Sequence, residues 1–252
     1  MPIDRFLFRR LFALGLALLA LGFFASRDNP NTQSLFDRPR DLENFIDKAR
    51  DASYEVNCNG RTGSGWGYRT EVDGEPYEFI VTNQHVIKFC IIDQDAEVIR
   101  QDGVTAGVEI VAHKRVLATY YNDLQAVDLA LLKFPAPLEA PLTQLASEHP
   151  QGSWLLISSF PVLAADLTNH QITTGAITGE TLQWGFTTDA ISSGGSSGGV
   201  VLNSRGQVLG THYATFSKED RAAYSMFLDN TYLDDLVKTA VANQKQNEKE
   251  NK

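Results

Sequence analysis

Short apolar or alternating segments, separated by Gly, Asn, Asp and Pro, run from Ser53 to about Leu228. Strand-length runs that are bounded by turn residues are typical of β-sandwiches and β-barrels. The sequence therefore predicts an all-β domain. The clearest candidate strands are Phe79–Thr82, Val108–Ala112, Val116–Tyr121, Leu129–Phe134, Trp154–Ser158, Ile172–Thr178 and Val208–Tyr213.

Two helices are expected at the ends of this β region. Asp41 is placed to cap a helix over Leu42–Ala52, because four apolar residues of that segment share one helical face. Asn230–Ala242 is the second helical segment. The folded domain is therefore expected to occupy residues 41–242.

The segments outside this domain are polar. Residues 26–40 carry two prolines and are expected to form a linker. Residues 243–252 (NQKQNEKENK) have no core residues, and we expect them to be a disordered, charged tail. Nothing follows this tail, so no appended binding domain is expected.

Residues 1–25 have the pattern of an export signal, because arginines precede Leu11–Ala25, which is uncharged and mostly apolar. The run is shorter than the roughly 17–25 residues of a spanning helix, which favours a cleaved signal peptide. Phe23 stands where a cleavage site after Ala25 needs a small residue, which favours an uncleaved membrane anchor. Both readings stay open. Both place the domain outside the cytoplasm, as a periplasmic, extracellular or membrane-anchored protein.

Charge and cysteine content exclude several classes of partner. The formal net charge is −9, so nucleic acid is not an expected partner. The chain has only two cysteines, and no Cys/His cluster has the spacing of metal ligands. We therefore expect neither a metal ion nor another cofactor.

The segment Gly195–Gly199 (GSSGG) is the first candidate for chemistry. A nucleophilic serine needs an exposed bend with backbone N–H groups aimed at a developing oxyanion, and glycines permit such a bend. Ser197 is the candidate nucleophile, and the N–H groups of Gly195 and Ser197 are the candidate oxyanion hole. A flexible Gly/Ser linker is the alternative, but the apolar run that follows at once argues against it.

Such a serine needs a histidine base that is oriented by a carboxylate. His85 is preferred among five histidines, because it follows an apolar strand and opens a loop. Asp128 immediately precedes a second apolar run, and Asp123 in a nearby polar loop is its competitor.

Several motifs, taken in order, resemble the chymotrypsin-fold (trypsin-like) serine proteases. The closest branches are the bacterial HtrA-like enzymes, here without a PDZ domain, and the glutamyl endopeptidases. The resemblance covers about Ser53 to Leu228. It is carried by TGSGWGY (62–68), VTNQHV (81–86), VDLALLKF (127–134), QITTGAIT (171–178) and TDAISSGGSSGGVVLNSRGQVLG (188–210).

This resemblance implies two six-stranded antiparallel β-barrels with the site between them. It implies a serine endopeptidase that cleaves polypeptides through an acyl-enzyme. His85 would be the general base, Asp128 its orienting acid and Ser197 the nucleophile. A catalytically inactive, peptide-binding module is the alternative. An esterase is disfavoured, because its fold orders the triad Ser, acid, His.

Ser192 and His212 lie five residues before and fifteen residues after Ser197. Glutamyl endopeptidases place a hydroxyl residue and a histidine at matching positions to bind an acidic P1 side chain. The resemblance therefore suggests cleavage after Glu or Asp, and a pocket for small apolar residues is the alternative. Relatives also often link the neighbourhoods of Cys58 and Cys90, which suggests a disulfide rather than two separate thiols.

Overall fold

The computed structural model describes residues 33–116, 127–164, 167–181, 185–216 and 224–250. The chain divides into two units, Met1–Ser34 and Leu35–Lys252, and every element named below belongs to the second unit. The N-terminal segment that sequence assigns to export, and the competitor Asp123, lie outside the described residues. No helix among the described residues is both long and apolar enough to cross a membrane.

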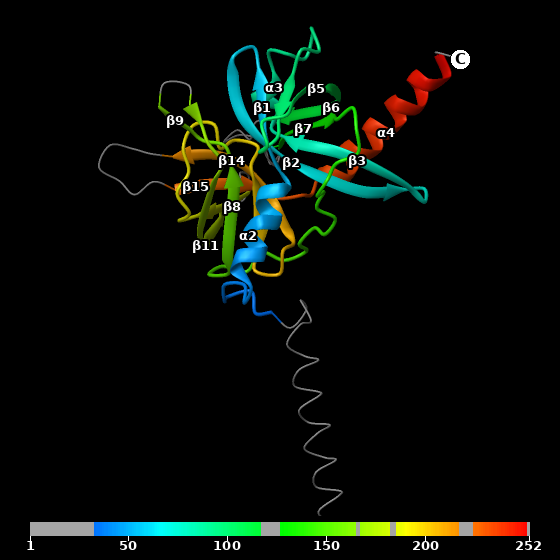
Figure 1. Ribbon diagram of the computed structural model, residues 1–252. Helices are drawn as coiled ribbons and strands as arrows, with labels where there is room; N and C mark the ends of the chain where they lie inside the picture. The colour runs from blue at the N-terminus through cyan, green and yellow to red at the C-terminus, as the bar shows by residue number, and fades with distance from the viewer. Residues whose placement is uncertain (1–32, 117–126, 165–166, 182–184, 217–223, 251–252) are drawn as a thin grey trace, which may run out of the picture. The chain divides into compact units, whose positions relative to one another are not determined.

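The first half of the domain is a curled, seven-stranded antiparallel sheet (Figure 1). Its strand order is β5-β4-β1-β2-β3-β7-β6. The sheet curls as half of a barrel, so it differs in detail from the closed six-stranded barrel that the resemblance implies. Its strands are β1 (Ser53–Cys58), β2 (Arg61–Val72), β3 (Glu75–Thr82), β4 (Glu97–Ile99), β5 (Thr105–Gly107), β6 (Glu109–Val116) and β7 (Val127–Lys133).

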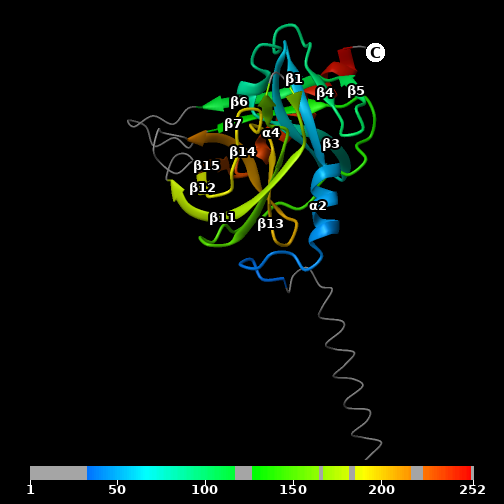
Figure 2. The same ribbon diagram turned by 60° about the vertical axis from the view of Figure 1, so that its left-hand side comes forward.

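The second half is a closed barrel in the order β11-β12-β15-β14-β13-β8, and every recorded pairing in it is antiparallel. Figure 2 shows the long β11 curving through this half. The barrel comprises β8 (Trp154–Ser159), β11 (Gln171–Thr181), β12 (Gly185–Thr188), β13 (Val200–Asn203), β14 (Val208–Phe216) and β15 (Tyr224–Leu228). A separate two-stranded sheet joins β9 (Val162–Ala164) and β10 (Leu167–Thr168). The predicted chymotrypsin-like, all-β fold is confirmed.

Helix α2 (Leu42–Asp51) forms where sequence predicts it, and the Asp41 carboxylate accepts a hydrogen bond from the Asn44 N–H. Its apolar face packs on the closed barrel, where the Phe45 ring meets the Trp154 ring edge-on at 5.7 Å. Figure 1 shows α2 running beside β8. The short helix α3 (Gln84–Ile87) follows β3.

Helix α4 (Leu233–Glu250) packs against β6 and β7 and is longer than sequence predicts. It includes most of residues 243–252, which were expected to be a disordered tail. Lys, Gln and Glu are adequate helix formers, so a helix that is already packed can continue through them. The Asn243 side chain also donates to the Val111 carbonyl at 3.1 Å, which fixes the start of this extension on the sheet.

Buried polar contacts join the two halves beside the serine loop. The Trp66 indole, on β2, donates to the Thr211 hydroxyl of β14 at 3.2 Å, and its ring is fully buried. The Ser64 N–H donates to the Ser197 carbonyl at 2.7 Å, and the Ser64 hydroxyl donates to the Gly195 carbonyl at 2.8 Å. Strand β2 of the curled sheet thus holds a loop that belongs to the closed barrel.

Candidate active site

The loop before β13 needs its glycines where it presses against β2. Gly198 has φ +91, in the left-handed region that favours glycine, and a Cβ there would collide with the Ser64 carbonyl. Gly195 also has φ +91, and a Cβ there would approach the Phe160 carbonyl to 2.7 Å. The sequence GSSGG therefore forms a tight bend with a fixed shape.

Two backbone N–H groups of this bend are available to a ligand. The N–H of Ser196 donates to Ser193, that of Gly199 to Ser196, and that of Gly198 to the His212 carbonyl, all at 2.9–3.1 Å. In the described part of the chain, the N–H groups of Gly195 and Ser197 donate to no backbone carbonyl. Such unpaired donors are what an oxyanion hole requires.

His85 and Asp128 lie in direct contact, although 43 residues separate them. The Asp128 side chain, near the start of β7, is only 1% exposed. Its Oδ1 accepts the His85 backbone N–H at 2.9 Å, and its Oδ2 lies 3.0 Å from the ring Nδ1. Asn83 donates to the Asp128 carbonyl at 2.7 Å, so the segment before α3 is anchored to β7. The carboxylate therefore fixes both the backbone and the ring of His85.

The Ser197 hydroxyl donates to the Tyr213 carbonyl at 3.2 Å, and no direct hydrogen bond to His85 is recorded in this conformation. Tyr213 also contacts His85, because the two rings meet edge-on at 5.9 Å between centroids. The structure thus pairs the candidate base with the candidate acid, and Tyr213 contacts both the nucleophile and the base. Catalytic hydrogen bonds are often long or poorly aligned before substrate binds.

Ser192 and His212 meet in a buried chain of hydrogen bonds. His212 Nε2 lies 2.8 Å from the Ser192 hydroxyl, which lies 2.7 Å from the Ser225 hydroxyl. Ser225 donates its only proton to the Ala190 carbonyl at 2.7 Å. Ser192 must then donate to Ser225 and accept from Nε2–H, because each hydroxyl has one proton. His212 is therefore the Nε2–H tautomer here.

His212 is neutral in this setting. Burial lowers the pKa of its imidazole to about 4, and the nearby His85 acts in the same direction, whereas a backbone contact with Ser196 opposes the shift. Its Nδ1 atom is buried without a hydrogen-bond partner. His212 Nε2–H and the Ser192 hydroxyl are therefore the neutral donors that could bind a ligand entering beside Ser192.

Three residues near the site were missed by the sequence analysis: Arg115, Tyr213 and Ser225. Arg115 donates through Nε to Asp128 Oδ2 at 3.1 Å, since it lies opposite Asp128 in the β6–β7 pairing. Ser225 is brought to Ser192 by the β12–β15 and β14–β15 pairings. Only strand register places these residues at the site, and no local motif marks them.

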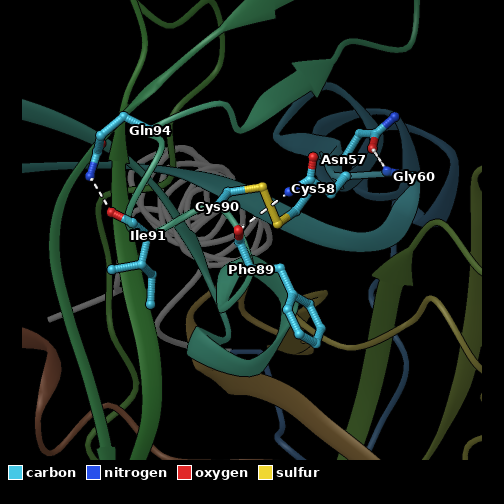
Figure 3. The surroundings of a disulfide bond; sticks show 8 residues. Asn57, Cys58, Gly60, Phe89, Cys90, Ile91 and Gln94 are labelled. Carbon is cyan, nitrogen blue, oxygen red and sulfur yellow. Dashed lines mark hydrogen bonds between the residues drawn. A yellow bond between two sulfur atoms is a disulfide. The ribbon is translucent and has the colours of Figure 1, made fainter.

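A disulfide links Cys58 at the end of β1 to Cys90 beyond α3, with the Cα atoms 5.7 Å apart (Figure 3). The alternative of two separate thiols is therefore excluded. The Asn59 side chain donates to the Phe89 carbonyl at 3.3 Å, which adds a second link between the β1–β2 turn and this segment. The segment that carries His85 is thus fixed at both ends, by the bond from Asn83 and by the disulfide. Among the described residues, no group of His, Cys, Asp or Glu could hold a metal ion.

Comparison with known proteins shows the family to which the chain belongs. Residues 63–210 match the family model of the trypsin-like peptidase domain, and the chain belongs to this family. The matched region contains His85, Asp128 and Ser197, whereas Cys58, Asn59, His212, Tyr213 and Ser225 lie outside it.

Solved structures show the same fold at low sequence identity. The serine endoprotease from Yersinia pestis is 21% identical with a TM-score of 0.63, and the match covers 82% of this chain and 68% of that chain. An inactive serine-to-alanine mutant of Rv3671c from M. tuberculosis H37Rv is 18% identical with a TM-score of 0.59, covering 82% and 96%. No curated protein matches the sequence.

Proposed function

We propose that this protein is a serine endopeptidase in which His85, Asp128 and Ser197 form the catalytic triad. One observation carries the proposal: the buried Asp128 carboxylate holds His85 by its ring and its backbone, and Tyr213 contacts both His85 and the hydroxyl of Ser197. Membership of the trypsin-like peptidase family supports the same reaction.

The reaction begins when a peptide carbonyl displaces the resting contacts of Ser197. The hydroxyl leaves the Tyr213 carbonyl and gives its proton to His85, while its oxygen attacks the scissile carbon. The N–H groups of Gly195 and Ser197 bind the resulting oxyanion, and Asp128 stabilises the imidazolium. His85 then protonates the leaving amine, and an activated water hydrolyses the acyl-enzyme.

An acidic P1 residue is the proposed preference. In the resting state His212 Nε2–H donates to Ser192 and Ser192 donates to Ser225, and a P1 carboxylate would replace both acceptors and bind these two neutral donors. A small apolar P1 residue would leave these two hydrogen bonds in place and would use neither donor.

A fluorophosphonate probe tests the proposed chemistry on the full chain. We expect the probe to label the wild type and not Ser197→Ala, whereas Ser193→Ala, an exposed serine in the same loop, keeps labelling. A folded wild type that stays unlabelled would support the inactive peptide-binding module instead. The observed Ser197–Tyr213 bond is what favours that second candidate.

A proteome-derived peptide library tests the specificity separately. Cut sites enriched at least tenfold in Glu or Asp at P1 are expected. Cleavage without this enrichment would reject the acidic pocket and leave the endopeptidase activity standing.

The proposed setting is outside the cytoplasm, with residues 1–25 as signal peptide or anchor and 26–40 as linker to the catalytic domain. The Cys58–Cys90 disulfide supports export, because such bonds persist in oxidising compartments. Mass spectrometry of the mature N-terminus distinguishes a cleaved signal from a retained anchor.

A further inference from the structure

Arg115 lies beside the proposed catalytic acid. It faces Asp128 across the β6–β7 pairing, and its Nε donates to the Oδ2 atom that also accepts from the His85 ring. About a third of the Arg115 side chain is exposed, at 35%, whereas Asp128 is almost fully buried. The guanidinium therefore reaches inward from the surface to a buried carboxylate.

A buried carboxylate must be compensated by hydrogen bonds or a cation. His85 is neutral when it acts as a base, so in that state the imidazole gives Asp128 a hydrogen bond but no charge. Among the described ion pairs, Arg115 is the only permanent cation in contact with Asp128. Arg115 thus supplies the charge that the resting triad lacks.

The same guanidinium also reaches Tyr213. Burial and then the Asp128 carboxylate raise the pKa of the Tyr213 phenol, and the Arg115 guanidinium opposes this shift. The neutral Tyr213 ring meets His85 edge-on, and its carbonyl accepts from Ser197. Arg115 therefore contacts the two residues that flank the proposed base.

We propose that Arg115 is a positioning residue that orients Asp128 and Tyr213 around His85 and keeps the base neutral under more acidic conditions. This inference rests on the proposed function, since it needs His85 to be the base. A fixed positive charge near Asp128 partly cancels the attraction between the carboxylate and a protonated imidazole.

Other groups near His85 do not replace Arg115. From β14, His212 interacts with His85 but is itself neutral above its pKa of about 4, and Tyr213 is a neutral phenol. Just after α3, the Lys88 ammonium lies over the Phe89 ring at 4.7 Å from its centroid, and the Arg61 guanidinium lies over the same ring at 4.3 Å. Arg115 and Asp128 therefore dominate the charge that His85 experiences.

Three variants of the full chain separate charge from packing. Arg115→Met keeps the apolar stem and removes the charge, and Arg115→Lys keeps the charge but loses the planar fork that binds two partners. Lys114→Met is the matched control, because this ammonium lies over the Tyr232 ring at 4.8 Å and adjacent strand residues point to opposite faces.

The measurement is kcat/KM against pH. In Arg115→Met the acidic limb moves up by about one pH unit, the order expected for a lost charge a few ångströms from the titrating pair. Arg115→Lys and Lys114→Met keep the wild-type limb, while Arg115→Lys lowers kcat severalfold. An Arg115→Met variant that is folded and active but has an unmoved acidic limb would overturn the inference.

A second measurement does not depend on activity. NMR titration of the His85 imidazole in the Ser197→Ala background, with and without Arg115→Met, should show a midpoint that rises by about one pH unit. Equal midpoints would overturn the inference even if the wild type is an active peptidase. A shifted midpoint in a protein that no probe labels would sustain the electrostatic inference and reject the proposed function.

Discussion

The two sides of the candidate site are held together in different ways. On the curled sheet, His85 is partly exposed, at 28%, and rests on a buried carboxylate that a guanidinium also contacts. On the closed barrel, His212 is fully buried, its Nε2 contacts the neutral Ser192 hydroxyl, and the titratable group that acts on its pKa is His85. One side is fixed by charges and the other by neutral hydrogen bonds.

This difference decides what each histidine can do. A carboxylate favours the protonated imidazole, which suits a base that must accept a proton during each cycle. Burial without a counter-charge keeps the other imidazole neutral, which suits a donor that binds a substrate carboxylate. In the proposed function, the same residue type would serve two purposes because its surroundings differ.

The largest effect should follow from removing the charge on the first side. We expect Asp128→Asn to lower kcat about 10⁴-fold, because an amide cannot stabilise the imidazolium and favours the wrong tautomer. Steady-state kinetics on a peptide substrate measure the loss, and circular dichroism checks the fold. Asp102→Asn, an exposed carboxylate, is the control and should stay within twofold of the wild type. A loss below tenfold in Asp128→Asn would show that the charge is dispensable.

The disulfide gives the next largest effect. Replacing Cys58 and Cys90 by serine should lower the free energy of unfolding by about 3–4 kcal/mol, because the bond closes a loop between residues 32 apart. Urea unfolding with and without reductant provides the comparison. Reductant should destabilise the wild type and leave the double variant unchanged. Equal stability of the two proteins without reductant would mean that the Asn83 and Asn59 contacts suffice to hold the segment.

The fold and the His85–Asp128 pair could be predicted from sequence, whereas Arg115 and part of the pocket could not. Asp41 and the apolar spacing of Leu42–Ala52 are local signals, and so is the order of His85, Asp128 and Ser197 with strand-like runs beside them. Ser225 and Arg115 carry no such signal, because only strand register brings them to the site. The Ser197–Tyr213 bond was also unpredictable, since it depends on side-chain rotation.

Because His212 is buried in its neutral form, we expect the free energy of unfolding to fall in acid. His212 has a pKa of about 4 in the folded protein against about 6.5 when unfolded, so the unfolded chain binds more protons between these values. Its contribution is complete above about pH 6.5 and falls by about 3 kcal/mol as the pH drops to 4. The unfolding free energy of His212→Gln should therefore decline less between pH 7 and pH 4.5 than that of the wild type. His113→Gln, on an exposed position, should follow the wild type, and parallel curves for all three proteins would contradict the assignment.

The smallest expected effect concerns Ser225, which ends the series of hydrogen bonds that runs from His212 through Ser192. Ser225→Ala leaves the buried Ala190 carbonyl without its donor and Ser192 without one acceptor, which should cost about 1–2 kcal/mol of unfolding free energy. Ser193→Ala, in the exposed part of the loop, should cost less than about 0.5 kcal/mol. Because the charged side is untouched, the acidic limb of the pH–rate profile should coincide with that of the wild type in both variants. If Ser225→Ala moved that limb, the two sides of the site would be electrostatically coupled, and the contrast between a charged and a neutral half would no longer hold.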